Sequence, residues 1–556
     1  MTQWIETLDV RVNFRREKGM GTGISSKLRA TAAIVCAFGL VTAVVAETGG
    51  SGAVQSLPTA PVPLCMPGDQ LACACDENQT HGANALVTPC FRGDLDRQVS
   101  TQTDPFAFIV FSALNWPKAA ARGEADFAAN PGRTGSAPDF VTVWDSWPNT
   151  RALFRVDGGD PGTWSTALTP LPAPCQAIDL AGAQQAQAWA KVPSGGPVHV
   201  LDSFLNPDDD ALIDLAGQPV RYEVMFNRQA FDYVTENRLW DPGGLTAYLA
   251  SDKANGGRLA FPMGHWTSTA RSRGAIVVKA AWKILDQGRD DPDHFHKAWA
   301  FVSPVITEGQ VKPDACEVRP VGLIGMHIAL KTKEFPDWLW ATFEHLAIAP
   351  TWDDLVEDAE FAPGYDEPQS ATTRWLFYTP QKADCVGAQN CGALAELNMA
   401  SKATGTPIPT TPSRITRMQK PGYYFSQDAG SGRCGAAQAT KGAGPLNDVL
   451  ATYHDMECLF TAGFKDSVMV YYQLKGAQWF NPGLDGRHVP EPDVLANAAL
   501  ESFSQAQSSC LGCHADARPA HSTSNLSVFE YIFAVGRDGL VPGSGTATTT
   551  TPAANN

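Results

Sequence analysis

The chain has 556 residues, of which 44% are hydrophobic and 18% charged, so it has the composition of an ordinary folded protein and enough length for one large core or several domains. Its formal net charge at pH 7 is −16, and its sequence pI is about 5.1. Because nucleic acids and anionic membrane surfaces attract basic proteins, this acidic balance argues against both as partners.

The N-terminus has the pattern of an export signal. Lys27 and Arg29 precede an apolar run, residues 30–46, which ends in small residues. The run is shorter than the roughly 20 apolar residues of a typical transmembrane helix. We therefore interpret residues 1–46 as an N-terminal extension with a signal peptide cleaved near Ala46. We expect a periplasmic or secreted protein with no integral membrane span in the mature chain.

The cysteine content agrees with export. Of the 13 cysteines, Cys36 would leave with the signal peptide, and two belong to the motif described below. An even number of remaining cysteines in an exported chain predicts up to five disulfides. Spacing does not decide which cysteines pair, although the short flexible loop between Cys385 and Cys391 makes these two the expected local pair. The ten remaining cysteines are Cys65, Cys73, Cys75, Cys90, Cys175, Cys316, Cys385, Cys391, Cys434 and Cys458.

Residues 47–92 contain four of these cysteines and little apolar periodicity, so we interpret them as a Cys-rich leader or cap. Residues 93–490 then carry the patterns of a main α+β domain. A continuous apolar run near its start, Phe106–Trp116, suits either a buried helix or a buried strand. Further along, Asn227 is placed to cap a short helix that runs to Trp240.

Several runs in the main domain are rich in Val, Ile and aromatic residues, which pleated strands prefer. They predict strands at Phe140–Trp144, Val198–Phe204, Val220–Phe226, Ala275–Leu285, Ala298–Ile306 and Ser467–Leu474. A longer stretch, Val321–Leu346, predicts another buried strand followed by a second element from Pro336. A helix is expected at Pro445–Phe460, where apolar residues recur near helical spacing.

Two histidines in the main domain form a weaker candidate for a metal site. His294 and His296 lie two residues apart beside Asp293, and together these side chains could bind a metal. We interpret the two histidines as an exposed polar pair, because two neighbouring polar residues without further ligands usually face solvent.

The most specific motif lies near the C-terminus, where Cys510, Cys513 and His514 form the pattern C-x-x-C-H. Each thiol of this pattern can add to one vinyl group of a haem, and the histidine is then held on one haem face as the proximal iron ligand. The alternatives are a disulfide or half of a zinc site, but no second C-x-x-C supplies the other zinc ligands. We therefore expect one covalently bound haem c.

The residues around the motif predict how it is presented. Glu491–Gln507 has apolar residues at helical spacing and Pro492 in its first turn, so it predicts a helix that leads into the motif. We interpret residues 491–540 as a haem c-binding helical segment packed on the main domain, and residues 541–556 as a disordered tail. The expected fold class is α+β: a large, loop-rich, β-containing domain with a C-terminal haem-binding helical segment.

Three stretches in this order, Phe111–Pro117, Gly325–His345 and Leu495–His514, resemble a family of exported bacterial mono-haem c-type cytochrome proteins. Together they span most of the mature chain, so the resemblance extends beyond the haem motif. It implies an oxidoreductase or an electron carrier and names no substrate.

The second axial ligand of such a haem would have to come from upstream, because no methionine follows His514. His327, within an apolar run that favours a neutral imidazole, is the tentative distal ligand. His345 and the nearby His521 are alternatives, His327 could instead be a satisfied core histidine, and the distal position could also be open.

These observations predict an exported c-type cytochrome that acts in periplasmic redox chemistry, either by electron transfer or by haem-dependent oxidation of a small substrate. Its partner would be a periplasmic redox protein or a small molecule. The chain is longer than electron transfer alone requires, which favours an enzyme. The alternative is a haem-based binding or sensory protein without turnover.

Overall fold

The computed structural model describes 103–126, 140–193, 196–201, 203–204, 210–251, 253, 259–266, 271–304, 312, 314–350, 375–378, 398–399, 411–418, 467–482 and 488–514. All of these residues belong to one of the two units into which the chain divides, Pro58–Asn556. The predicted signal peptide, the Cys-rich leader, the helix at Pro445–Phe460 and the C-terminal tail lie outside the described residues.

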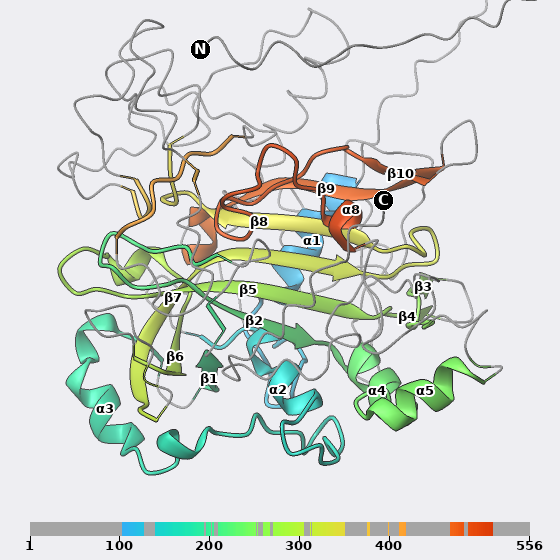
Figure 1. Ribbon diagram of the computed structural model, residues 1–556, viewed down its shortest axis with the longest axis horizontal. Coiled ribbons are helices and arrows are strands. Elements are labelled where there is room, and N and C mark those ends of the chain that lie inside the picture. Colours follow the sequence, from blue (N-terminus) through green and yellow to red (C-terminus); the bar gives the residue numbers. More distant parts are fainter. Residues whose placement is uncertain are drawn as a thin grey trace, which may run out of the picture. The chain divides into compact units, whose positions relative to one another are not determined.

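The centre of the fold is an eight-stranded mixed sheet (Figure 1). Its strands are β1 (Val198–Leu201), β2 (Arg221–Phe226), β5 (Ile276–Ile284), β6 (Lys297–Val302), β7 (Glu317–Leu330), β8 (Leu339–His345), β9 (Tyr472–Pro482) and β10 (His488–Glu491). The long strand β7 pairs with β5 along one edge and with β6 and then β8 along the other. β8 continues to β9 and β10, β5 pairs with β2, and only the β1–β6 pair is parallel. A separate two-stranded sheet joins β3 (His265–Trp266) to β4 (Arg271–Ser272).

Most of the predicted strands are confirmed. The runs that begin at Val198, Val220 and Ala275 contain β1, β2 and β5, and the runs that begin at Ala298 and Val321 overlap β6 and β7, which start one and four residues earlier. The strand predicted at Phe140–Trp144 is wrong, because turns and the 3-10 helix Trp144–Ser146 lie there. The strand predicted at Ser467–Leu474 begins late, after a 3-10 helix at Val468–Tyr471.

The helices are short and flank the sheet. They are α1 (Thr103–Leu114), α2 (Thr150–Leu153), α3 (Leu180–Ala186), α4 (Arg228–Glu236), α5 (Pro242–Leu249) and α8 (Cys510–His514). The apolar run at Phe106–Trp116 is therefore mainly helical. The N-cap predicted at Asn227 is confirmed, since its side chain accepts a hydrogen bond from the Ala230 N–H. That helix ends at Glu236, before Trp240.

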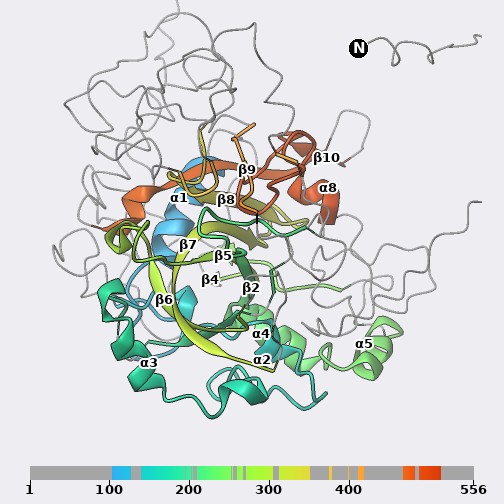
Figure 2. The same ribbon diagram turned by 60° about the vertical axis from the view of Figure 1, so that its left-hand side comes forward.

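The two faces of the sheet carry different elements. Along β8, Ala341 and Phe343 belong to the core that includes α1, and Phe111 of α1 stacks on Phe343 with ring centroids 4.0 Å apart. Trp340 and Thr342 alternate with them and therefore point to the other face. That second face is covered by residues 494–514, which we call the covering segment. Figures 1 and 2 show α1 and α8 at separate places beside β8 and β9.

The helix predicted at Glu491–Gln507 is wrong. The chain there is irregular and turn-rich, and only Cys510–His514 is α-helical. Three consecutive N–H groups, at 497–499, donate to the side chains of Glu501, Glu344 and Asn497 at 3.0, 3.0 and 2.9 Å. Because side-chain acceptors take these donors, an α-helical hydrogen-bond ladder does not form at this point.

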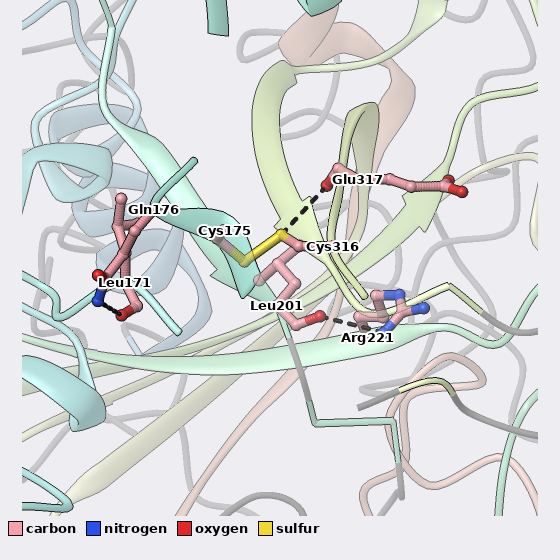
Figure 3. The surroundings of a disulfide bond; sticks show 7 residues. All are labelled: Leu171, Cys175, Gln176, Leu201, Arg221, Cys316 and Glu317. Atoms are coloured by element: carbon pink, nitrogen blue, oxygen red, sulfur yellow. Dashed lines mark hydrogen bonds between the residues drawn. A yellow bond between two sulfur atoms is a disulfide. The ribbon is translucent and has the colours of Figure 1, made fainter. Parts of the chain in front are cut away.

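One disulfide is part of the described fold. Cys175 and Cys316 are bonded, with Cα atoms 5.1 Å apart, across 141 positions of sequence (Figure 3). Cys175 ends a 3-10 helix, Ala173–Cys175, and Cys316 directly precedes β7. The bond therefore ties a surface turn to the start of the central strand. The other eight cysteines with a predicted disulfide role lie outside the described residues.

A second feature of the core is a buried network of ionisable side chains. His199 Nδ1 lies 2.7 Å from Glu223 Oε1, and His296 Nε2 lies 2.8 Å from Asp145 Oδ2. His199 Nε2 and Asp145 Oδ1 are 3.9 Å apart. Since His296 is 1% exposed, the prediction of an exposed histidine pair is wrong for this residue. No group of three or more metal-binding side chains with suitable placement occurs among the described residues.

The network couples stability to pH. Burial lowers the pKa of His199, but the charges of Glu223 and Asp145 outweigh it and raise this pKa above 6.5. Burial raises the pKa of Asp145, but His296 and then His199 outweigh it and hold this pKa below 3.8. The stabilising contribution of His199 is therefore complete below pH 6.5 and is lost as the pH rises through its folded pKa. That of Asp145 is lost as the pH falls through its own folded pKa.

We expect the free energy of unfolding to decline on the alkaline side as His199 loses its proton. His199→Gln should flatten this decline, whereas His294→Gln, outside the network, should leave it intact. Urea denaturation at a series of pH values between 5 and 10 measures both. An alkaline decline that is equally steep in wild type and His199→Gln would assign it to other groups.

Candidate functional site around Cys510–His514

The C-x-x-C-H motif forms a single short helix, α8. The Ser509 hydroxyl accepts a hydrogen bond from the Gly512 N–H at 3.0 Å, and the Cys513 N–H donates to the Ser509 carbonyl at 2.9 Å. Cys510 and Cys513, three residues apart, therefore lie on one side of the helix. Neither cysteine is in a disulfide, and Cys510 is buried whereas Cys513 is exposed.

Helix α8 packs against an apolar part of the sheet. Cys510 and Leu511 belong to a core cluster whose members from the sheet and the covering segment include Val277, Ala329, Trp340, Phe480 and Leu495. At the end of the helix, the His514 ring centroid lies 4.3 Å from that of Trp340, with the ring planes at 45°. All three residues of the predicted haem motif are thus placed at one face of β8 and β9.

His327 lies on this same face. Strand register places Lys279, His327, Thr342 and Gly476 in one row across β5, β7, β8 and β9. Thr342 alternates with the core residues that face α1, so the whole row faces the covering segment. The structure therefore brings the tentative distal residue and the haem motif to one side of the sheet.

His327 is paired with a residue of the covering segment, Glu501. Its Nε2 atom lies 3.3 Å from Glu501 Oε2, and both side chains are about nine-tenths buried. Burial raises the pKa of Glu501, but the charges of His327 and Lys279 outweigh it and hold this pKa below its ordinary value. Glu501 is also close enough to Cys510 to contribute to raising the pKa of that thiol. The charge of Glu501 thus acts on both His327 and the Cys510 thiol.

Of the two alternative distal ligands, His345 and His521, the structure describes only His345. His345 alternates with Glu344, so its side chain leaves β8 on the side opposite to Glu344. At this end of the strand its ring stacks on Phe295 with centroids 4.5 Å apart. Its Nδ1 atom accepts a hydrogen bond from the Ala347 N–H at 3.1 Å, and its Nε2 atom lies 2.9 Å from the His294 carbonyl oxygen. His345 is thus a satisfied core histidine away from the motif. His521 lies outside the described residues.

Two glycines let the covering segment approach the sheet closely. A Cβ atom on Gly325 would lie 3.1 Å from the Cβ of Ala499, and one on Gly476 would lie 3.1 Å from Leu495 Cδ1. Polar contacts then fasten the segment. The Asn497 amide donates to Thr342 Oγ1 at 2.9 Å and to the Phe343 carbonyl at 2.7 Å.

A buried cluster of charged side chains around Glu344 of β8 also holds the covering segment. Glu344, at 0% exposure, accepts the Ala498 N–H and pairs with Arg417 and Lys475. Burial raises the pKa of Glu344, but Lys475 and Arg417 outweigh it and lower this pKa below its ordinary value. Burial lowers the pKa of Lys475 to about 8. Two cations therefore keep Glu344 ionised as an acceptor for the segment's backbone.

The amide of Gln478 in β9 binds the start of α8 and also Pro492, just before the covering segment. Its Oε1 atom accepts hydrogen bonds from the Leu511 N–H at 2.9 Å and the Ser509 hydroxyl at 3.2 Å. Its Nε2 atom donates to the Pro492 carbonyl at 2.6 Å. Sequence reasoning missed Gln478, Glu501 and Asn497, because no local pattern marks a buried polar side chain whose partners are distant in sequence.

The chemistry of the site argues against Cys510 as a catalytic nucleophile. Burial, then the charge of Glu501, raises the pKa of the Cys510 thiol well above 9.0, so the reactive thiolate is disfavoured. The remaining donors fit a haem: a second thiol three residues on, an imidazole directly after it, and an apolar bed. Trp340 also carries a buried indole N–H without a hydrogen-bond partner, which a polar group of a ligand could accept.

No protein-family model matches the chain, and no curated protein and no solved structure is significantly similar to it. Among the described helices, none has the length and apolar character needed to span a bilayer. Function therefore has to be argued from the residues of the site.

We expect the two motif cysteines of the haem-free chain to differ strongly in reactivity. Cys513 is exposed and should react quickly with iodoacetamide, whereas burial and the raised pKa should slow Cys510 by about 10-fold or more. Tandem mass spectrometry of the tryptic peptide that contains both cysteines, after timed alkylation, measures both rates, and alkylation in urea is the control. Equal rates in the folded chain would contradict the docking of α8.

Proposed function

We propose that this chain is an exported c-type cytochrome that carries one haem c, attached to Cys510 and Cys513, with His514 as the proximal iron ligand. The observation that carries the proposal is the placement of two cysteines outside any disulfide and a following histidine on one short helix against an apolar bed. The bound haem would supply one-electron exchange. The reaction would be periplasmic redox chemistry with a redox protein or a small substrate.

Export is supported by two independent features. The N-terminal sequence has a basic region followed by an apolar run. The Cys175–Cys316 disulfide suits an oxidising compartment. Covalent haem attachment in bacteria also takes place outside the cytoplasm, so a periplasmic or secreted location is consistent with the proposed cofactor.

The chain's own residues have distinct roles in this proposal. Cys510 and Cys513 would hold the haem, and the contact with Trp340 orients His514. Val277, Ala329 and Phe480 form the apolar bed that excludes water from this side. A core of this size around the site suits an enzyme that binds a substrate, in addition to an electron carrier.

The haem should remain with the protein after acid–acetone extraction, because unfolding does not break thioether bonds. The protein must be matured with a cytochrome c assembly system. Cys510→Ala and Cys513→Ala should each leave one bond, and the double variant should release all of its haem. Haem released from wild type would contradict the proposal.

His327 remains our candidate for the distal side of this haem, because it lies on the motif's face of the sheet and close to Glu501. For Nε2 to ligate iron, the contact between His327 Nε2 and Glu501 Oε2 would have to break. If the contact between Glu501 and His327 persists, His327 does not occupy the sixth coordination position of the iron. An open sixth position favours a haem-based binding or sensory protein, or an enzyme that activates a small ligand. The Glu501–His327 contact is the observation that favours this second candidate.

His327→Ala should change the haem spectrum, from low to high spin if His327 ligates, or in carbon monoxide binding if it only lines the pocket. Oxidised, reduced and carbon monoxide spectra of wild type and variant measure this. His345→Ala, a buried histidine on the neighbouring strand that faces the other way, is the matched control. Three unchanged spectra in a folded His327→Ala protein would make His327 a core residue.

A further inference from the structure

We propose that Gln478 is the positioning residue of the Cys510–His514 site: its side-chain amide holds α8 at the place on the sheet where His514 meets Trp340. The spectroscopic part of this inference rests on the proposed haem function. The part that concerns thiol protection needs no haem.

Strand register places the two contacts side by side. Gln478 in β9 is directly opposite Trp340 in β8, so both side chains face the covering segment. Gln478 contacts the start of α8 through Ser509 and Leu511. Trp340 contacts its last residue, His514. Two neighbouring side chains therefore hold the two ends of the same helix.

Helix α8 depends on such contacts because it is very short. It has five residues, far fewer than an isolated helix needs for stability in water. Its position must therefore come from tertiary contacts. Gln478 is 0% exposed, and its hydrogen bond with the Leu511 N–H is buried away from competing water.

The chemistry requires an amide at this position. Gln478 accepts two hydrogen bonds with Oε1 and donates one with Nε2, so it needs an acceptor and a donor on neighbouring atoms. An ionised glutamate lacks the donor for Pro492, and methionine lacks both groups. The bond to Pro492 also joins the place where the chain leaves β10 (His488–Glu491) to the start of α8.

The matched control lies on the same strand. Gln473 is also buried in β9, and its amide donates to Glu344 Oε1 at 3.1 Å and makes no hydrogen bond to α8. Gln473→Met and Gln478→Met therefore each remove a buried amide of similar volume from β9. Gln473→Met removes one hydrogen bond to Glu344, and only Gln478→Met removes hydrogen bonds to the start of α8.

In the haem-free full-length chain, Gln478→Met should raise the rate of Cys510 alkylation by about 10-fold or more, because lost buried hydrogen bonds favour the open state by that order. Gln473→Met should change this rate by less than about 2-fold. In the haem-loaded full-length chain, Gln478→Met should shift the reduced absorption spectrum and the midpoint potential. Gln473→Met should match wild type in both.

Gln478→Glu is the second variant, for use if far-UV circular dichroism shows that Gln478→Met is unfolded. It keeps the acceptor for Leu511 but places a carboxylate against the Pro492 carbonyl, so its effects should have the same direction. The inference would be overturned if a folded Gln478 variant matched Gln473→Met in its Cys510 alkylation rate, its reduced absorption spectrum and its midpoint potential. If wild type holds no covalent haem but Gln478→Met still exposes Cys510, the proposed function fails and the positioning role stands.

Discussion

The described fold depends on how an irregular chain segment, the covering segment, is held against a sheet. The covering segment is fastened by polar side chains that rise from the strands beneath it: Glu344 from β8 and Gln478 from β9. Asn497 completes the attachment from the segment's side. Each such buried hydrogen bond adds about 1 kcal/mol net, but leaving its partner unpaired costs about 1–3 kcal/mol. The contacts are therefore strongly specific for one docked arrangement.

This arrangement explains why the candidate site lies where it does. Gly325 and Gly476 have no side chains, so the segment can lie close to the sheet at these two positions. The motif helix then reaches the apolar bed around Trp340, and Glu501 reaches His327. On the opposite face, α1 fills the space with aromatic side chains such as Phe111, and there the polar His199–Glu223 contact is separate from the motif. The two faces thus divide the molecule into a structural core and a site.

The sheet itself was largely predictable, because the signal for a buried strand is local. Runs of Val, Ile and aromatic residues identified β2, β5, β6 and β7, and Asn227 identified the start of α4. The prediction failed where local pattern and tertiary environment disagree. Residues 491–507 have apolar residues at helical spacing, but the chain is buried on several sides and Glu344, 154 positions away, takes the N–H of Ala498. No window of sequence contains that acceptor.

The sequence alone determined the chemistry proposed for the site, since the spacing of Cys510, Cys513 and His514 is a property of one turn of chain. It also identified His327 as a polar residue in an apolar run. Only the tertiary structure decided that His327 faces the motif while His345 faces away, because the direction of a strand residue depends on register and on what packs against each face. The same holds for Gln478 and Glu501, whose partners meet them only after distant strands and the covering segment have come together.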